Sequence, residues 1–284
     1  MRKETHPMNQ QMKTIMRTLS LALAASATLG GAVRGQTFQT DRTVDAQPGM
    51  RLQVENHFGR VTVRAWDRPA VRVQASHPSD VRVEVDVSGS LVQVEASHGG
   101  KSVEYVLTVP ADMPLEIDVV QGEVDVSGTR AGMQIQSVNG AITVHGGDGS
   151  IDLGSVQGSI TLEGARGEVH AESVNGRIQL RGIDSGRVTA ETVNGAVSYE
   201  GSIRSDGWYR FSTHNGGIDL TIPANAGATF TASTFNGTLV TGFPVTLREA
   251  KEGKEFSFTL GSGGARIELE TFNGTMSIRR PGQP

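Results

Sequence analysis

Apolar and polar residues alternate in short runs between residues 114 and 280, and one nine-residue run recurs. Aligned on its closing glycine, the run reads PLEIDVVQG at 114–122, GMQIQSVNG at 132–140, SIDLGSVQG at 150–158, EVHAESVNG at 168–176, RVTAETVNG at 187–195, WYRFSTHNG at 208–216, TFTASTFNG at 229–237 and RIELETFNG at 266–274. A second alternation follows the glycine, as in AITV at 141–144 and SITL at 159–162. Because successive side chains of a strand point to opposite faces, each period predicts two short strands with one apolar face.

The closing glycines are 18, 18, 18, 19, 21, 21 and 37 residues apart. A unit of two short strands cannot bury its apolar face alone, whereas stacked copies can. The pattern therefore predicts an all-β fold, a parallel β-helix-like β-solenoid with coils of about 18 residues and two strands per coil. The alternative is a pair of sheets with mixed strand directions, since Asn-Gly is also a hairpin signal. The last spacing, 37 residues between Gly237 and Gly274, predicts about two coils, one of them degenerate, with an inserted loop near Arg248–Glu255.

The recurring Asn-Gly turn predicts a corner where the chain bends once per coil. Glycine and asparagine tolerate positive φ, so we expect that conformation at this corner. Stacked amide side chains can also hydrogen-bond along a β-stack. We therefore predict a structural turn ladder, to which Gln121 and Gln157 also belong, made of Asn139, Gly140, Asn175, Gly176, Asn194, Gly195, Asn215, Gly216, Asn236, Gly237, Asn273 and Gly274.

Residues 36–113 alternate as strands but lack the Asn-Gly turn, as in RVTVRAW at 60–66. Exposed end strands invite edge pairing, so this region is expected to cap the solenoid. The predicted organisation is a signal peptide at 1–35, an N-terminal β-strand capping region at 36–113, the repeat solenoid at 114–280 and a disordered tail at 281–284.

Residues 1–35 combine Lys13 and Arg17 with the apolar stretch LSLALAASATL at 19–29. This pattern is typical of a secretory signal, and small residues place the cut near Gly35. We expect an exported protein, periplasmic or extracellular, with no transmembrane segment in the mature chain. After residue 35 the chain keeps 21 basic and 29 acidic residues and no cysteine, which excludes disulfides and gives nucleic-acid binding no electrostatic basis.

The stretch VPADMPLEIDVVQGEVDVSG at 109–128, the tandem SVNG units and GGARIELETFNGTMSI at 263–278 resemble the bacterial β-strand-repeat family labelled "putative adhesin", a domain of unknown function. The resemblance covers roughly 50–280 and departs from the pattern at Gln121, Gln157 and His214. It implies an exported or envelope-associated β-repeat protein, and it carries over no catalytic residues.

One outward face of the second strands carries small polar residues and forms a candidate surface binding strip. Its predicted members are Thr143, Thr161, Gln179, Ser198 and Asp219, joined by Trp208 as the best candidate for an exposed aromatic. An envelope glycan or an envelope protein would fit such a flat repetitive surface. The alternative is a solvated sheet face without a ligand.

Sites for chemistry are not indicated. HGGDGSIDL at 145–153 resembles a calcium-binding nonapeptide, but the aspartate is displaced by one position and the motif occurs once. Asp152 and His170 are expected on adjacent coils, where a metal would need further ligands. The acids Asp125, Asp152, Glu168 and Asp219 are scattered, whereas polysaccharide hydrolases need paired carboxylates. We predict no catalytic residue, cofactor or metal.

The sequence favours a non-enzymatic, adhesin-like binding or scaffolding module at the cell envelope. Two alternatives stay open: a self-assembling structural element, associating through the solenoid ends, or an envelope-stress protein that binds a partner. A polysaccharide-active enzyme is the third reading.

Overall fold

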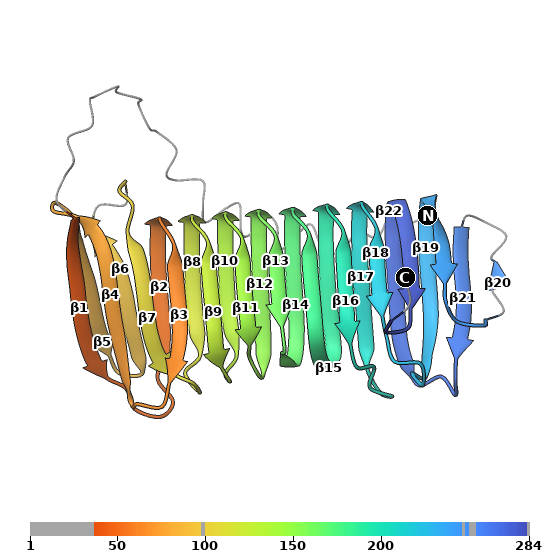
Figure 1. Ribbon diagram of the computed structural model, residues 1–284, viewed down its shortest axis with the longest axis horizontal. Helices are drawn as coiled ribbons and strands as arrows, with labels where there is room; N and C mark the ends of the chain where they lie inside the picture. The colour runs from red at the N-terminus through yellow and green to blue at the C-terminus, as the bar shows by residue number, and fades with distance from the viewer. Residues whose placement is uncertain (1–36, 98–99, 246–247, 250–253, 283–284) are drawn as a thin grey trace, which may run out of the picture. The chain divides into compact units, whose positions relative to one another are not determined.

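The computed structural model describes residues 37–97, 100–245, 248–249 and 254–282. The predicted signal peptide at 1–35 lies outside the described residues. All regular structure in the described ranges is β-strand, arranged in two layers that face each other (Figure 1). The described part of the chain contains no helix long and apolar enough to cross a membrane.

The first layer holds the first strand of each coil. In spatial order its members are β5 (Arg82–Ser88), β6 (Leu91–Ser97), β2 (Arg51–Phe58), β8 (Leu115–Gln121), β10 (Met133–Asn139), β12 (Ser150–Gln157), β14 (Arg166–Asn175), the C-terminal part of β15 (Ile178–Asn194), β17 (Trp208–Asn215), the N-terminal parts of β22 (Ala265–Arg279) and β19 (Ala228–Thr241), β21 (Lys254–Leu260) and β20 (Arg248–Glu249).

The second layer holds the second strands. In spatial order they are β1 (Thr37–Asp45), β4 (Ala70–Pro78), β7 (Glu104–Pro110), β3 (Val61–Trp66), β9 (Val124–Thr129), β11 (Ile142–Gly146), β13 (Ile160–Glu163), the N-terminal part of β15, β16 (Val197–Gly201), β18 (Ile218–Thr221) and the C-terminal parts of β22 and β19. All pairings from β6 and β7 to β19 are parallel, which confirms the predicted β-solenoid.

The core is the thin space between the layers. Like residues stack on like: Ile135 pairs with Ile117 on one side and Leu153 on the other, and all three side chains are buried. Burying an aliphatic side chain of this size contributes roughly 1.5–3 kcal/mol relative to leaving it exposed. A single coil could not bury these side chains without its neighbours, so the coils are stable only as a stack.

The chain leaves sequence order at both ends of the stack. Near the C-terminus, β22 lies between the coil of β17 and β18 and the earlier strand β19. Near the N-terminus, β2 and β3 lie between the coil of β6 and β7 and the coil of β8 and β9. The final chain segment and an early one are therefore interior coils, and other strands cover them.

The prediction of a degenerate extra coil between Gly237 and Gly274 is wrong. That stretch contains β21, which runs antiparallel to residues 228–234 of β19 and cannot be a parallel coil. The predicted loop near Arg248–Glu255 includes β20 and otherwise falls largely outside the described residues. The spacing of 37 residues between Gly237 and Gly274 arises because the antiparallel strand β21 comes between β19 and β22, and β22 then pairs with β17.

The predicted division at residue 113 stays a prediction, and both layers run across it without a break. β2 pairs with β8, and β3 pairs with β9. Antiparallel strands β1, β4 and β5 lie beyond these coils. Residues 281–282 form a turn after β22.

Candidate functional site

Five of the six predicted strip residues form one continuous row on the second layer, which we call the second-layer row. Thr143 pairs with Thr161, Thr161 with Gln179, Gln179 with Ser198, and Ser198 with Asp219. The row continues into Asp125 at one end and through Ser277 to Val240 at the other. Its side chains are short, and Asp219 is neutralised by Arg279 at 2.9 Å.

Trp208 does not belong to this row. It lies on β17 in the first layer, where it pairs with Arg187 on one side and Arg266 on the other. The outward faces of the two layers point in opposite directions, so one flat ligand surface cannot include both Trp208 and the row. Tyr105 and Tyr209 offer no alternative aromatic surface, because both are buried in the core.

The Asn-Gly corner forms a partial amide ladder. Asn273 donates to Asn215 at 2.9 Å, Asn215 to Asn194 at 2.9 Å, and Asn194 to Asn175 at 2.8 Å. The other predicted amides are stacked in register beside their neighbours. These bonds are exposed along the corner, and the partly exposed glycines follow directly after the amides.

Positive φ at the corner glycines is a wrong prediction. Gly140, Gly158, Gly176, Gly195, Gly216 and Gly237 do not have it, and Gly122 and Gly274 have φ of 159° and 154°, next to the extended region. Glycine is required for another reason. A Cβ at Gly176 would overlap the carbonyl oxygen of Gly158 and lie 2.6 Å from its carbonyl carbon. The left-handed conformation occurs at the opposite corner instead, where Gly146 and Gly164 have φ of 104° and 69°.

A buried hydroxyl column runs beside the corner and was missed by the sequence reasoning. Its members stand two residues before each turn amide, on the inward face. Five of them donate to the carbonyl oxygen of the preceding corner glycine at 2.8–3.4 Å, in the pairs Ser155–Gly140, Ser173–Gly158, Thr192–Gly176, Thr213–Gly195 and Thr271–Gly216. Ser137 and Thr234 occupy the same position, and their buried hydroxyls have no hydrogen-bond partner among the described residues. The alternation of the strands could have predicted this column, because these Ser and Thr residues lie an even number of positions from the apolar core residues and therefore point inward.

A second missed feature is an outward apolar row on the first layer. It comprises the residues directly before the turn amides, namely Val120, Val138, Val156, Val174, Val193, His214, Phe272 and Phe235. The valines are half-buried, whereas the aromatic end is exposed. The rings of His214 and Phe272 stack at 4.7 Å, and those of Phe272 and Phe235 do so at the same distance. Phe235 and Phe272 are therefore exposed aromatics that the sequence analysis did not identify.

Charges on the first layer meet at Arg210. Its guanidinium contacts Glu191 at 3.0 Å, Glu268 at 3.2 Å and Glu270 at 3.0 Å. These acids lie on β15 and β22, the two neighbours of β17. One cation thus links three successive coils and holds β22 in its interior position.

Asp118, on β8, lies partly exposed in an acidic part of the same layer. Desolvation by neighbouring strands, reinforced by the charges of Glu116 and Glu55, raises the pKa of Asp118 to about 6. The folded state therefore binds this proton more tightly than the unfolded state does. As pH rises from about 4 through 6, the carboxylate must ionise in an unfavourable place, and stability falls.

Asp118→Asn is expected to remove that loss. At pH 7 the variant should be more stable than the wild type by about 1 kcal/mol, a discounted value because solvent screens the site. At pH 4 the two proteins should have similar stability. Urea unfolding at both pH values measures the difference. An equal difference at both would show that Asp118 does not titrate with a raised pKa in the folded protein.

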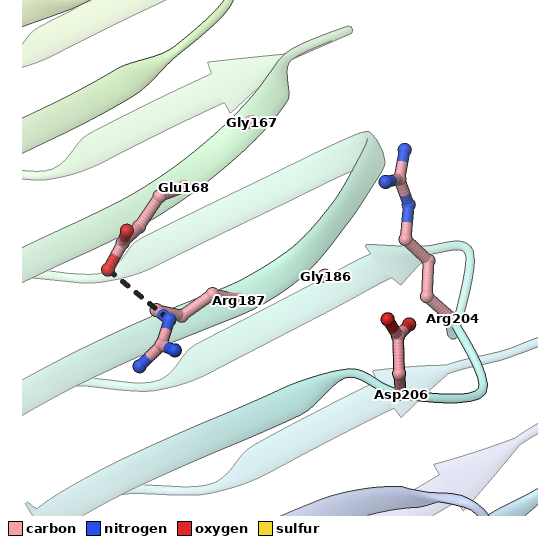
Figure 2. Close-up of a pocket in the computed structure, with 6 residues that line it drawn as sticks. All are labelled: Gly167, Glu168, Gly186, Arg187, Arg204 and Asp206. Carbon is pink, nitrogen blue, oxygen red and sulfur yellow. Dashed lines mark ion pairs between the residues drawn. The ribbon is translucent and has the colours of Figure 1, made fainter.

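A shallow pocket lies beside β14 and the C-terminal part of β15, next to the segment that leads into β17 (Figure 2). Gly167 and Gly186 contribute no side chains, and Glu168, Arg187, Arg204 and Asp206 surround them. Arg187 pairs with Glu168 at 3.5 Å, and Arg204 pairs with Asp184 at 3.3 Å. Since each cation already has a carboxylate, the pocket offers no uncompensated positive charge to an anionic ligand.

The acids considered for catalysis are not brought together. Asp125 and Asp219 belong to the second layer, whereas Asp152 and Glu168 belong to the first. Asp152 does pair with His170, as expected for adjacent coils. Within the described residues, no group of three His, Asp or Glu side chains could hold a metal ion.

Comparison with known proteins gives one family match and several solved structures. The family described as Toastrack DUF4097 matches residues 51–279. A structure described as a putative adhesin from Parabacteroides distasonis is 9% identical, with 87% of this chain and 98% of that chain covered and a TM-score of 0.47. A putative adhesin from Parabacteroides merdae is 6% identical, covers 87% and 97%, and has a TM-score of 0.40. A putative lipid binding protein from Parabacteroides distasonis is 10% identical, covers 87% and 97%, and has a TM-score of 0.37. No curated protein matches the chain.

Proposed function

The chain belongs to the Toastrack DUF4097 family, and on that premise we propose that it is an exported, non-enzymatic binding or scaffolding module of the cell envelope. The signal-like pattern of residues 1–35 supports export. The family is one of unknown function, so the ligand class has to come from the surface of this chain.

The observation that carries the proposal is the second-layer row. Thr143, Thr161 and Gln179 repeat at the spacing of stacked strands, about 4.8 Å, without an interrupting loop. Ser198 continues the row, but its hydroxyl oxygen is buried. Short hydroxyl and amide side chains on a rigid sheet can donate and accept hydrogen bonds with little loss of side-chain entropy. A flat polymer with its own repeat, such as an envelope glycan, would meet this row at many equivalent points.

Co-sedimentation of the purified mature protein with envelope fractions of its host tests the proposal. Peptidoglycan, surface polysaccharide and membranes would be offered separately, and light scattering would give the oligomeric state of the same sample. We expect saturable binding of a monomer to one fraction. Failure to bind together with growth into larger assemblies would favour the self-assembling structural element, and release of sugar products would favour the enzyme.

A pair of variants locates the surface. Thr161→Arg places a long cationic side chain in the middle of the row and should weaken binding by at least about tenfold, or about 1.4 kcal/mol. Thr189→Arg makes the same change on the first layer, where Thr189 is also half-buried and faces outward, and should bind like the wild type. Equal loss in both variants would remove the row from the proposal.

A further inference from the structure

Among the described strands, only β21 pairs with the outer edge of β19, the last strand of the stack, and it does so along half of the length of β19. β22 pairs with its inner edge from Ala228 to Thr241, whereas β21 pairs with the outer edge only from Ala228 to Thr234 (Figure 1). No strand in the described ranges pairs with the outer edge of Thr238–Thr241. Backbone donors and acceptors along such an edge are a template for a further strand.

Exposed apolar side chains gather on the same coil. Val240 is 55% exposed, Phe235 is 73% exposed, and Phe272 on the adjacent strand is 41% exposed. Phe235 stacks on Phe272 with one face of its ring, so its other face points off the end of the stack. Leu239 packs against the core from this last position, with no coil in the described residues beyond it on the second layer.

The edges at the other end of the stack are built differently. β1 carries Asp41, Arg42 and Asp45, and β5 carries Arg82, Glu84 and Asp86. Charged side chains on edge strands discourage the addition of another strand. The segment TLVTGF at 238–243 has no charged residue. Only this edge combines free extended backbone with β-branched and aromatic side chains among the described strands.

We propose that the Thr238–Thr241 edge of β19 is a docking site for an extended strand of a partner protein. The strand would be uncharged where it pairs, with apolar or hydroxyl side chains beside Val240 and Thr238. Main-chain hydrogen bonds would supply affinity, and the exposed side chains would supply selectivity. Val240 is also the last residue of the second-layer row, but strand pairing uses the backbone edge of β19 and does not depend on the row binding envelope material.

The size of the edge argues for a strand rather than a second copy of the chain. Stable interfaces between proteins bury about 1,600 Å² in total. Two four-residue edges related by a twofold axis would bury only a small part of that. They would also run antiparallel, so the Phe235 rings of the two copies could not continue the stack.

The natural probe is the sequence that already pairs with the inner edge. A fluorescent peptide with the sequence TFNGTMSI, residues 271–278, would be titrated against the full-length purified protein and followed by anisotropy. We expect saturable binding. A peptide with proline at the positions of Thr275 and Ser277 cannot donate those main-chain hydrogen bonds and should bind at least about tenfold more weakly.

Two protein variants test the location. Val240→Lys adds a charge to the proposed edge and should weaken peptide binding by at least about tenfold. Val87→Lys is the matched control, because Val87 is 51% exposed on β5 at the opposite end, and it should bind like the wild type. The proposal is overturned if the wild type shows no saturable binding or if both variants lose it equally. Self-association of the protein that Val240→Lys abolishes would also overturn it, because the occupant would then be a second copy.

Discussion

Replacing Gly176 with alanine is expected to lower the free energy of unfolding by about 3 kcal/mol or more. The added Cβ would collide with the main-chain carbonyl of Gly158 rather than with a flexible side chain. That carbonyl also accepts the hydrogen bond from Ser173 in the buried hydroxyl column. The clash can be relieved only by separating two coils, which loosens the parallel pairing of β12 with β14.

Urea unfolding followed by far-ultraviolet circular dichroism measures this loss. Gly100→Ala is the control, since Gly100 has no atom within 4 Å of an added Cβ and no positive φ. Its stability should stay within about 0.5 kcal/mol of the wild type, as is usual for surface positions. A Gly176→Ala protein as stable as the Gly100→Ala protein would show that the coils separate at little cost.

Ending the chain after Gly264 is expected to unfold one end of the stack while the middle persists. The truncation removes β22, which is a direct neighbour of β17, β18 and β19. It also removes Glu268 and Glu270, two of the three acids around Arg210. Stacked coils contact mainly their neighbours, so the damage should stay local rather than spread to β8–β13.

Hydrogen exchange read peptide by peptide tests this expectation. Amides of residues 208–234 should exchange at least about a hundredfold faster in the truncated protein, whereas those of residues 115–163 should keep their protection. Ending the chain after Arg280 removes only residues beyond β22 and is the control. Unchanged protection at 208–234 would mean that β17 and β19 close the gap by pairing directly.

The middle of the fold follows from the sequence because its determinants are local and repeated. The 18-residue spacing of the corner glycines predicts which residues become neighbours, and Ile117, Ile135 and Leu153 stack as that spacing requires. The ends could not be predicted in this way. Whether RIELETFNG at 266–274 pairs with β17 or with β21 depends on contacts between distant segments, including Arg210 with Glu268, and no periodicity encodes that choice.

The candidate surface was also predictable only in part. The alternation of side chains along each strand is enough to predict that Thr143, Thr161, Gln179 and Ser198 share an outward row. Trp208 was joined to them because exposed tryptophan is a common binding residue, although its position in the first strand of a coil already puts it on the other layer. Phe235 and Phe272 were overlooked because they occupy the valine position of the turn motif, where a ring projects beyond the neighbouring side chains.

The interior position of β22 separates the order of synthesis from the order of assembly. Among the described strands β22 is the last to be synthesised, yet β17, β18 and β19 all have it as a neighbour. A chain growing from its N-terminus can stack β8 to β16 as they appear, but it cannot complete the coils around β17 and β19 until β22 has been synthesised. Until then, the parallel edges of β17 and β19 stay available, and they become interior strands only when the final fifteen-residue strand is inserted between them.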